Sequence, residues 1–198
     1  MSNAVRRYLI MTVGSLLIGV GVAAVIAGDL GSDSMTTLEQ GISRALKIDM
    51  SLAPLIANGL FILALLAVDR SRVSIDTIIC PFQITLGIKL ANLIISPAEG
   101  MFMRIVCLVA GYLIIALGIG VGAQSKTGSN PYDGFVLALA EKLGWDYRIV
   151  RWALDIAVLL IGVLLGGSFG IGTFYAIALT GVLANFFINL LKKRLNEE

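Results

Sequence analysis

The fold is decided by one stretch of this sequence, YLIMTVGSLLIGVGVAAVIAGDLGS (residues 8–32), a long apolar run that ends at a polar Gly-Ser break. A second stretch, IVCLVAGYLIIALGIGVGAQSKTGS (residues 105–129), follows the same course 97 positions later. The landmarks that coincide at this offset are Gly14 with Gly111, Gly21 with Gly118, Gly31-Ser32 with Gly128-Ser129, Asp49 with Asp146 and Asn58 with Asp155. This pattern indicates a duplication.

Both halves share one order of segments: a long apolar run, a polar break, a short helix-like stretch and two further apolar runs. We place repeat one at about 6–97 and repeat two at about 103–194, within a single membrane domain of residues 1–198. Hydrophobic residues make up 58% of the chain and charged residues 14%, and the mean hydropathy is +0.92. Because a soluble domain carries about a quarter charged residues, each half is too apolar to fold in water.

The apolar runs are long enough to cross a membrane, since about 20 helical residues span a hydrocarbon core of roughly 30 Å. Six runs qualify: residues 8–27, 52–68, 74–96, 104–123, 149–166 and 171–191. The first run is too long and uniform for the apolar core of a signal peptide, so we expect a retained span. The sequence therefore predicts an all-α membrane protein with six transmembrane helices.

Basic residues predict how these spans are oriented. If each run crosses once, one side of the membrane receives eleven of them: Arg6, Arg7, Arg70, Arg72, Lys126, Lys142, Arg148, Arg151, Lys192, Lys193 and Arg194. The other side receives three: Arg44, Lys47 and Arg104. The positive-inside rule then predicts that both termini lie in the cytoplasm. Three spans per half is an odd number, so we expect inverted repeats, as in many secondary transporters.

A stretch too short to cross lies between the first two spans of each half. In the first half, Met35, Leu38, Ile42 and Ala45 recur at helical spacing. Their polar neighbours predict an amphipathic helix lying at the membrane interface. Residues 131–143 of the second half are more apolar, so this helix is either interfacial or re-entrant, and a re-entrant helix must be covered by protein or line a cavity. Asn130 before Pro131 is typical of a helix N-terminus.

Several small motifs occur in a recognisable order. In the second half they are Gly128-Ser-Asn-Pro131-Tyr-Asp133, Arg151 and Asp155, Leu165-Gly-Gly167, Gly170-Ile-Gly-Thr173 and Gly181; in the first half they are Asp29-Leu-Gly31, Leu38 and Gly41-Ile-Ser43. Together they resemble the YczE/YyaS/YitT group of bacterial integral membrane proteins, most closely the YczE type. The resemblance implies a small multispan inner-membrane protein and brings no biochemical activity with it. One departure is Met35-Thr36, where such proteins carry an aromatic–Asp pair.

Asp155 is the most informative ionisable residue, because an acidic side chain inside a span costs a few kcal/mol unless it faces a cavity or a partner. One interpretation is a functional site that faces a shared interior with Asn58, its counterpart in repeat one. The alternative is an anchoring pair with Arg151, four residues earlier, near the cytoplasmic face. Arg72 and Asp76 have the same spacing, and we expect an anchoring pair there.

Two polar turns complete the candidate substrate-binding residues. Gly31-Ser32 and Gly128-Ser129 precede helix N-termini, whose N–H groups and dipole attract anions or carbonyl groups. Asp33 and Asn130 compete with a ligand as caps for those N–H groups. The full predicted set is Asn58, Asp155, Gly31, Ser32, Gly128, Ser129 and Asp133.

The residue inventory argues against catalysis, a metal or a cofactor. The chain contains no histidine, which removes the commonest metal ligand and the side chain best suited to titrate near neutral pH. Cys80 and Cys107 lie inside apolar runs, where cysteine usually serves as a small hydrophobe. No paired acidic or nucleophile–base arrangement is visible, so we do not expect an enzyme.

Two functions remain open at this point. The leading one is a transporter or channel for a small solute, with a site between inverted repeats. The alternative is an accessory or regulatory membrane protein that binds a partner and moves nothing. The expected partners are the lipid bilayer, a small solute and, as an open alternative, a second copy of the chain. Nucleic acid is not expected.

Overall fold

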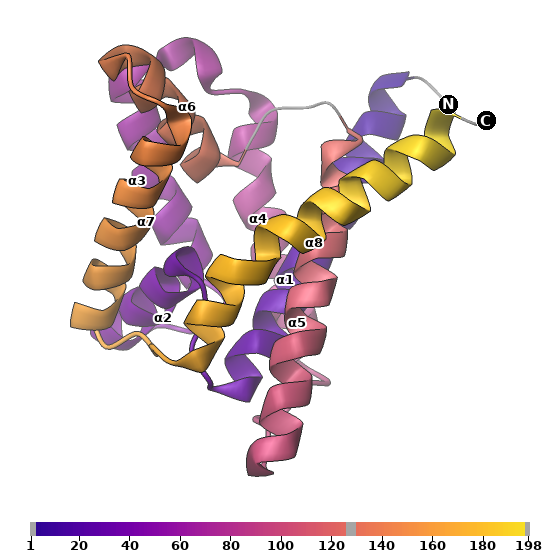
Figure 1. Cartoon of the computed structure of the whole chain (residues 1–198), viewed down its shortest axis with the longest axis vertical. Helices are drawn as coiled ribbons and strands as arrows, with labels where there is room; N and C mark the ends of the chain where they lie inside the picture. Colours follow the sequence, from indigo (N-terminus) through magenta and orange to yellow (C-terminus); the bar gives the residue numbers. More distant parts are fainter. Residues whose placement is uncertain (1–2, 126–129, 197–198) are drawn as a thin grey trace. The chain divides into compact units, whose positions relative to one another are not determined.

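The computed structural model describes residues 3–125 and 130–196, which are helical almost throughout (Figure 1). The elements in chain order are α1 (Asn3–Gly28), α2 (Ser34–Leu46), α3 (Ala53–Val68), the short 3-10 helix η1 (Arg70–Arg72), α4 (Ile75–Asn92), α5 (Gly100–Ala123), α6 (Pro131–Leu143), α7 (Tyr147–Leu164) and α8 (Ile171–Asn196). Each predicted apolar run contains one long helix, and the two short predicted helices are α2 and α6. The all-α prediction is confirmed.

Two helices in the described part of the chain are long and apolar enough to cross a membrane, Val5–Gly28 and Gly100–Ala123. A third qualifies if the two pieces of α8, Ile171–Ile177 and Val182–Lys192, are one span bent by 42°. The apolar α3 is shorter, with 16 residues. Length and apolarity thus give two clear spans, and the count of six stays a prediction. Charged residues such as Arg151 and Asp155 lower the hydropathy of α7.

The chain forms two compact units. Unit 1 contains Met1–Asp33, Gln83–Thr127 and Phe169–Glu198, and unit 2 contains Ser34–Phe82 and Gly128–Ser168. Each unit therefore combines segments from both predicted repeats. Helix α4 begins in unit 2 and ends in unit 1, and its internal Pro81 lies beside that division. The assignment of one domain with two sequential repeats stays a prediction.

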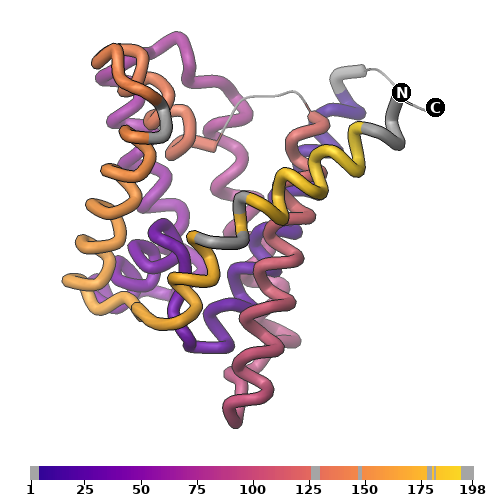
Figure 2. The backbone as a smooth tube through the Cα atoms, viewed as in Figure 1, coloured from indigo at the N-terminus to yellow at the C-terminus, as the bar shows by residue number. Residues whose placement is uncertain are grey.

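Unit 1 is built on a close crossing of α1 with α5, which we call the glycine seam (Gly14, Gly21, Gly111 and Gly118). A Cβ added to Gly14 would lie 2.8 Å from the carbonyl oxygen of Gly118, and one added to Gly21 would lie 2.6 Å from that of Gly111. As residue numbers rise along α1, the residues they contact on α5 fall in number. Helices α1 and α5 therefore run antiparallel, side by side (Figure 2). Only glycine allows two helix backbones to approach this closely.

Helix α8 packs along α5 in the parallel direction. Gly172 at its start lies against Leu108, and Ile188 near its end accepts a hydrogen bond from Gln124 Nε2 at 3.3 Å. Because α5 is antiparallel to α1, the beginning of α1 and the end of α8 lie at the same end of unit 1. The buried core of this unit contains Val22, Ala23, Val25, Ile88, Ala91, Leu108, Tyr112, Ile115 and Ala176.

The end of α4 packs along α1, also in the parallel direction. Gln83 Nε2 donates to Thr12 Oγ1 at 2.8 Å, and a Cβ added to Gly87 would lie 2.5 Å from the carbonyl oxygen of Leu16. Unit 1 therefore contains two parallel helix pairs, α1 with α4 and α5 with α8, joined through the antiparallel glycine seam.

In unit 2, the short helices α2 and α6 share one geometry. Both have 13 residues, and they begin 97 positions apart. Each ends at a left-handed residue, Lys47 with φ 54° and Gly144 with φ 67°. The next N–H donates to a carbonyl five residues back in both cases, Ile48 to Ser43 at 3.0 Å and Trp145 to Ala140 at 3.1 Å. This is the hydrogen bond of a Schellman C-cap, so the duplication extends to local backbone geometry.

The two short helices also pack in equivalent ways. Helix α2 packs mainly on α7, the second long helix of the other repeat, and α6 packs mainly on α3. Asn130 caps α6 as the sequence predicts, because its side chain accepts from the Tyr132 N–H at 2.8 Å. The core of unit 2 contains Leu38, Ile42, Ala53, Ala57, Tyr132, Val136, Ala140, Val150 and Val158.

The polar side of α2 is covered by protein, and the predicted place of this helix at the membrane interface stays a prediction. Residues 36–42 are all buried, including Glu39 and Gln40 at 6% exposure each. Gln40 Oε1 accepts from the Ser168 N–H at 2.8 Å, and Arg44 donates to the Gly166 carbonyl oxygen and to Ser168 Oγ. The polar side of α2 therefore covers the chain just past the end of α7, where helix carbonyl groups lack internal partners.

The glycine seam makes a testable prediction. The Cβ of Gly118→Ala would lie 2.8 Å from the Gly14 carbonyl oxygen, so we expect a loss of about 1–3 kcal/mol in the free energy of unfolding. The matched control is Gly122→Ala on the same helix, whose Cβ meets nothing within 4 Å. It should be neutral or gain roughly 0.5–1 kcal/mol from helix propensity. Reversible unfolding in mixed detergent micelles measures both, and equal effects would contradict the seam.

Candidate functional site

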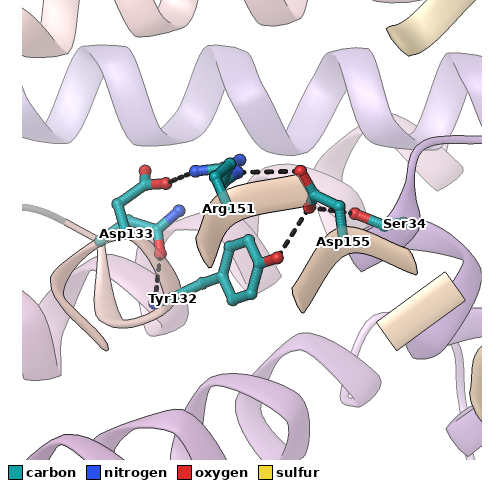
Figure 3. Close-up of polar contacts among 6 residues, drawn as sticks. Ser34, Tyr132, Asp133, Arg151 and Asp155 are labelled. Atoms are coloured by element: carbon teal, nitrogen blue, oxygen red, sulfur yellow. Dashed lines mark hydrogen bonds and ion pairs between the residues drawn. The ribbon is translucent and has the colours of Figure 1, made fainter. Parts of the chain in front are cut away.

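Asp155 lies on α7 and accepts three hydrogen bonds from three different helices (Figure 3). Its Oδ1 accepts from Ser34 Oγ at 2.8 Å and from the Tyr132 hydroxyl at 2.7 Å, while its Oδ2 accepts from Arg151 Nε at 3.0 Å. Ser34 is the first residue of α2, and Tyr132 is the second residue of α6. The carboxylate thus holds α2, α6 and α7 together within unit 2.

Arg151 extends this arrangement to a second carboxylate. Its Nη1 donates to Asp133 Oδ1 on α6, and its guanidinium lies 4.8 Å from the centre of the Tyr132 ring. The side chains of Arg151 and Asp155 are 32% exposed and that of Asp133 is 39% exposed. We call Ser34, Tyr132, Asp133, Arg151 and Asp155 the Asp155 cluster. Two carboxylates against one guanidinium leave it one formal negative charge in excess.

Packing against neighbouring side chains holds the Tyr132 ring in place, in addition to its hydrogen bond to Asp155. Its side chain is 1% exposed, and the ring of Phe61 on α3 packs edge-on against it with centroids 4.8 Å apart. Burial, and then the hydrogen bond to Asp155, raise the pKa of Tyr132 above its ordinary value. The hydroxyl therefore stays protonated and acts as a hydrogen-bond donor to the carboxylate.

The beginning of α2 favours a negative charge at this place. Ser34, the first residue of α2, bonds Asp155 through a short side chain, so the carboxylate lies beside the N-terminus of α2. The positive end of a helix dipole stabilises an anion within the first turn by about 0.3–1 kcal/mol. Asp155 itself thus supplies the negative charge that a helix N-terminus attracts, and no external anion is needed there.

Two of the predicted site residues come together in this cluster. Arg151 joins Asp133 to Asp155, so the predicted Arg151–Asp155 pair forms, but with Ser34 and Tyr132 as additional donors. Sequence reasoning named neither donor as a site residue. The aromatic–Asp pair Tyr132-Asp133 was a usable signal for Tyr132. Nothing local in the sequence pointed to Ser34, which reaches Asp155 across 121 positions.

Asn58, the predicted counterpart of Asp155, has a different environment. It is 5% exposed and donates from Nδ2 to the carbonyl oxygen of Pro54 at 2.9 Å. It lies on α3 one turn before Phe61, whose ring contacts Tyr132. Its polar group is bonded within its own helix, and the shared polar interior predicted for Asn58 and Asp155 stays a prediction.

The first of the two predicted Gly-Ser turns is enclosed by protein. Gly31 has φ 94°, and its Cα lies so close to Gly170 that an added Cβ would be 2.4 Å from that backbone nitrogen. Ser32 is fully buried, and the Asp33 N–H donates to the Tyr112 hydroxyl at 2.9 Å. A ligand role for this turn stays a prediction. The second turn, Gly128-Ser129, lies outside the described residues.

The predicted anchoring pair between Arg72 and Asp76 is wrong. Arg72 Nε donates to Asp69 Oδ2 at 3.0 Å, and its Nη2 pairs with Glu141 at the end of α6. The reason is that η1 turns the chain before α4 begins, so Arg72 and Asp76 do not share a helix. Hydrogen bonds from Ser71, the side-chain bond first, lower the pKa of Asp69.

Comparison with known proteins gives a family and several relatives. A family model described as a family of unknown function, DUF6198, matches residues 5–189. An uncharacterised protein of Haemophilus influenzae is 25% identical over 177 residues, which cover 89% of this chain and 81% of that protein. The uncharacterised protein YyaS of Bacillus subtilis is 20% identical over 190 residues, 94% of each chain. The uncharacterised membrane protein YczE of Bacillus subtilis is 23% identical over 183 residues, 92% of this chain and 85% of YczE.

These relatives confirm the resemblance to the YczE and YyaS type that the motifs indicated. The membrane relative YczE and the apolar helices of this chain agree on a membrane protein. No solved structure matches the chain.

Tyr132→Phe tests whether the Asp155 cluster holds unit 2 together. The variant keeps the ring contacts with Phe61 and Arg151 but removes the donor to the carboxylate, so we expect a loss of about 1.5–3 kcal/mol in the free energy of unfolding. Tyr8→Phe is the control, since Tyr8 is 41% exposed, and should change stability by no more than roughly 0.5 kcal/mol. In an Asp155→Asn background the Tyr132→Phe loss should shrink. Additive losses would contradict a direct interaction.

Proposed function

The chain belongs to the DUF6198 family, and on that premise we propose that this membrane protein is a transporter or channel for a small solute. The site of that solute includes the Asp155 cluster. The protein lies in the inner membrane of a bacterium, with six spans arranged as two inverted repeats and both termini in the cytoplasm.

The observation that carries the proposal is the Asp155 cluster itself. Three ionised side chains lie together on α6 and α7, in a chain with only 14% charged residues. Charged groups within membrane helices are costly and, as a rule, face a cavity, a partner or a pathway. A lone anchoring pair needs neither Ser34 nor Tyr132, yet both donate to Asp155. Three helices therefore contribute side chains to the cluster, as they do in a binding site. About a third of each charged side chain stays accessible.

The glycine seam supports the inverted repeats. Gly14 lies against Gly118, and Gly21 lies against Gly111. Exchanging each residue for its counterpart 97 positions away turns the first contact into the second, which is the signature of a two-fold axis. The antiparallel directions of α1 and α5 also require an even number of crossings between them, and therefore an odd number of spans per repeat, if both helices span the membrane.

Unit 2 supports the same symmetry. Exchanging repeats turns the packing of α2 on α7 into the packing of α6 on α3, and both are present. The chemistry is not symmetric, however, because Arg151 and Asp155 correspond to Pro54 and Asn58 in repeat one. Two half-sites of similar shape thus differ in charge, and the solute is bound mainly by the second.

The charge of the cluster indicates the class of solute. Two carboxylates oppose one guanidinium, so the cluster attracts a cationic or neutral solute and repels an anion.

Asp155→Asn tests the function directly. We expect purified protein to be stabilised against heat by one member of a panel of monovalent cations, small amines, amino acids and polyols, because binding to the folded state adds stability by mass action. Asp155→Asn should weaken that stabilisation by about tenfold in concentration or more, since it removes the charge that recognises the solute. Uptake of the same compound into proteoliposomes should fall in parallel.

The matched control is Asp69→Asn. Asp69 is 34% exposed and bonded to an arginine Nε at 3.0 Å, as Asp155 is at 32% exposure, but it lies at the end of α3 outside the cluster. It should leave both the stabilisation and the uptake unchanged. If Asp155→Asn behaves like Asp69→Asn, Asp155 is an anchor and not part of the site. If no compound stabilises the protein or enters the vesicles, the accessory role is favoured over transport.

The topology can be tested without a solute. Cysteines introduced at Ser2 and at Glu198 should resist a membrane-impermeant thiol reagent in intact cells and react after lysis, because the positive-inside rule places both ends in the cytoplasm. A cysteine at Lys47, in the loop after α2, should react from outside. Labelling of either terminus in intact cells would overturn the six-span topology and the inverted repeats together.

A further inference from the structure

Four buried side-chain oxygens in the described residues have no hydrogen-bond partner: Asp76 Oδ1, Gln83 Oε1, Thr85 Oγ1 and Thr180 Oγ1. Three of them lie on α4, and the fourth lies on α8. These two helices are counterparts, since α4 begins at Ile75 and α8 begins at Ile171, 96 positions later. Gln83 and Thr180 are 97 positions apart, so the same part of the duplicated helix carries an unpartnered oxygen in both halves.

Both helices are interrupted near these oxygens. Pro81 lies inside α4 and has no N–H to donate to the preceding turn. Thr180 lies between Ile171–Ile177 and Val182–Lys192, the two pieces of α8 that are bent by 42°. Interrupted helices at membrane depth are tolerated where they are buried in protein or line a water-filled cavity. Burial alone would leave the polar oxygens unsatisfied, so the second case fits them better.

The free-energy cost of burying an unpaired oxygen is high in a dry protein interior and low where water can act as its partner. Thr85 is 6% exposed, and nearly all buried polar groups in proteins find a partner in protein or in ordered water. A buried water typically makes about three hydrogen bonds to groups of this kind. The amide of Gln83 is already fixed at its other end, where Nε2 donates to Thr12, so its Oε1 is held in place and ready to accept.

We propose that α4 and α8 line a hydrated interior at Gln83, Thr85 and Thr180, which is the path of the solute through unit 1. The solute path rests on the proposed function, but the hydration of this interior can be tested by itself. The three groups are an amide oxygen and two hydroxyls, so the path accepts water and small neutral solutes that donate hydrogen bonds. Selection by charge is left to the Asp155 cluster.

Cysteine accessibility tests the hydrated interior. In a background with Cys80→Ala and Cys107→Ala, single variants Thr85→Cys and Thr180→Cys would be treated with a small water-soluble methanethiosulfonate in proteoliposomes. Thiolates form only where water reaches, so both should react about tenfold faster or more than lipid-facing controls on the same helices. The controls are Leu86→Cys, at 50% exposure, and Val182→Cys, at 64% exposure. Equal rates within each pair would overturn the proposal.

Thr85→Val provides a second measurement that does not depend on labelling. Valine keeps the shape of threonine and removes the hydroxyl. In a dry interior the loss of an unpartnered hydroxyl stabilises the protein, whereas in a hydrated one it removes a hydrogen bond to water and stabilises nothing. We expect a melting temperature in detergent that is unchanged or lower, and a higher one would overturn the proposal. Thr12→Val removes the acceptor of Gln83 and the donor to the Tyr8 carbonyl oxygen, and it shows the combined size of these two lost protein hydrogen bonds.

The outcomes separate this inference from the proposed function. Slow labelling of Thr85→Cys and Thr180→Cys in a protein that transports a solute would overturn the path along α4 and α8 and leave the Asp155 site standing. Fast labelling in a protein that transports nothing would support the hydrated interior and contradict transport.

Discussion

A polar group that has left water must find its partner inside the protein, and most of this structure follows from that constraint. Backbone groups meet it through helices, which is why nearly every described residue is helical. Ends of helices meet it through side chains: Asn130 caps α6, and Gln40 and Arg44 bond the chain just past the end of α7. Asp155 meets it with three donors from three helices. The few buried oxygens on α4 and α8 that have no hydrogen-bond partner are exceptions to this constraint.

A second constraint follows from the lack of a strong hydrophobic force between helices in lipid. Association there depends on close packing, and glycine provides it by removing the side chain. The seam between α1 and α5 in unit 1 and the contact of Gly41 with Gly162 in unit 2 both bring backbones within side-chain distance. Rigid packing of this kind holds α2 against α7, and thereby holds Ser34 close to Asp155.

The Asp155 cluster combines a structural and a functional capacity in the same atoms. Its donors position three helices. About a third of each charged side chain is exposed and the cluster has an excess negative charge, so a solute can compete for these donors. A group that only anchors a helix gains nothing from such competition. A group that couples binding to a change in helix packing requires it, because a ligand shifts an equilibrium only through differential interactions with two states.

The sequence by itself determined the all-α class, the membrane setting and the bounds of α6, because hydropathy and local capping are properties of neighbouring residues. It also predicted the Arg151–Asp155 pair as one of two alternatives, since the two residues lie one helical turn apart. Only the tertiary structure decided that Ser34 and Tyr132 complete the cluster, that Glu39 and Gln40 are buried, and that Arg72 pairs with Asp69 and Glu141. Those contacts depend on which helices pack together and where the chain turns, and periodicity along one helix cannot specify either.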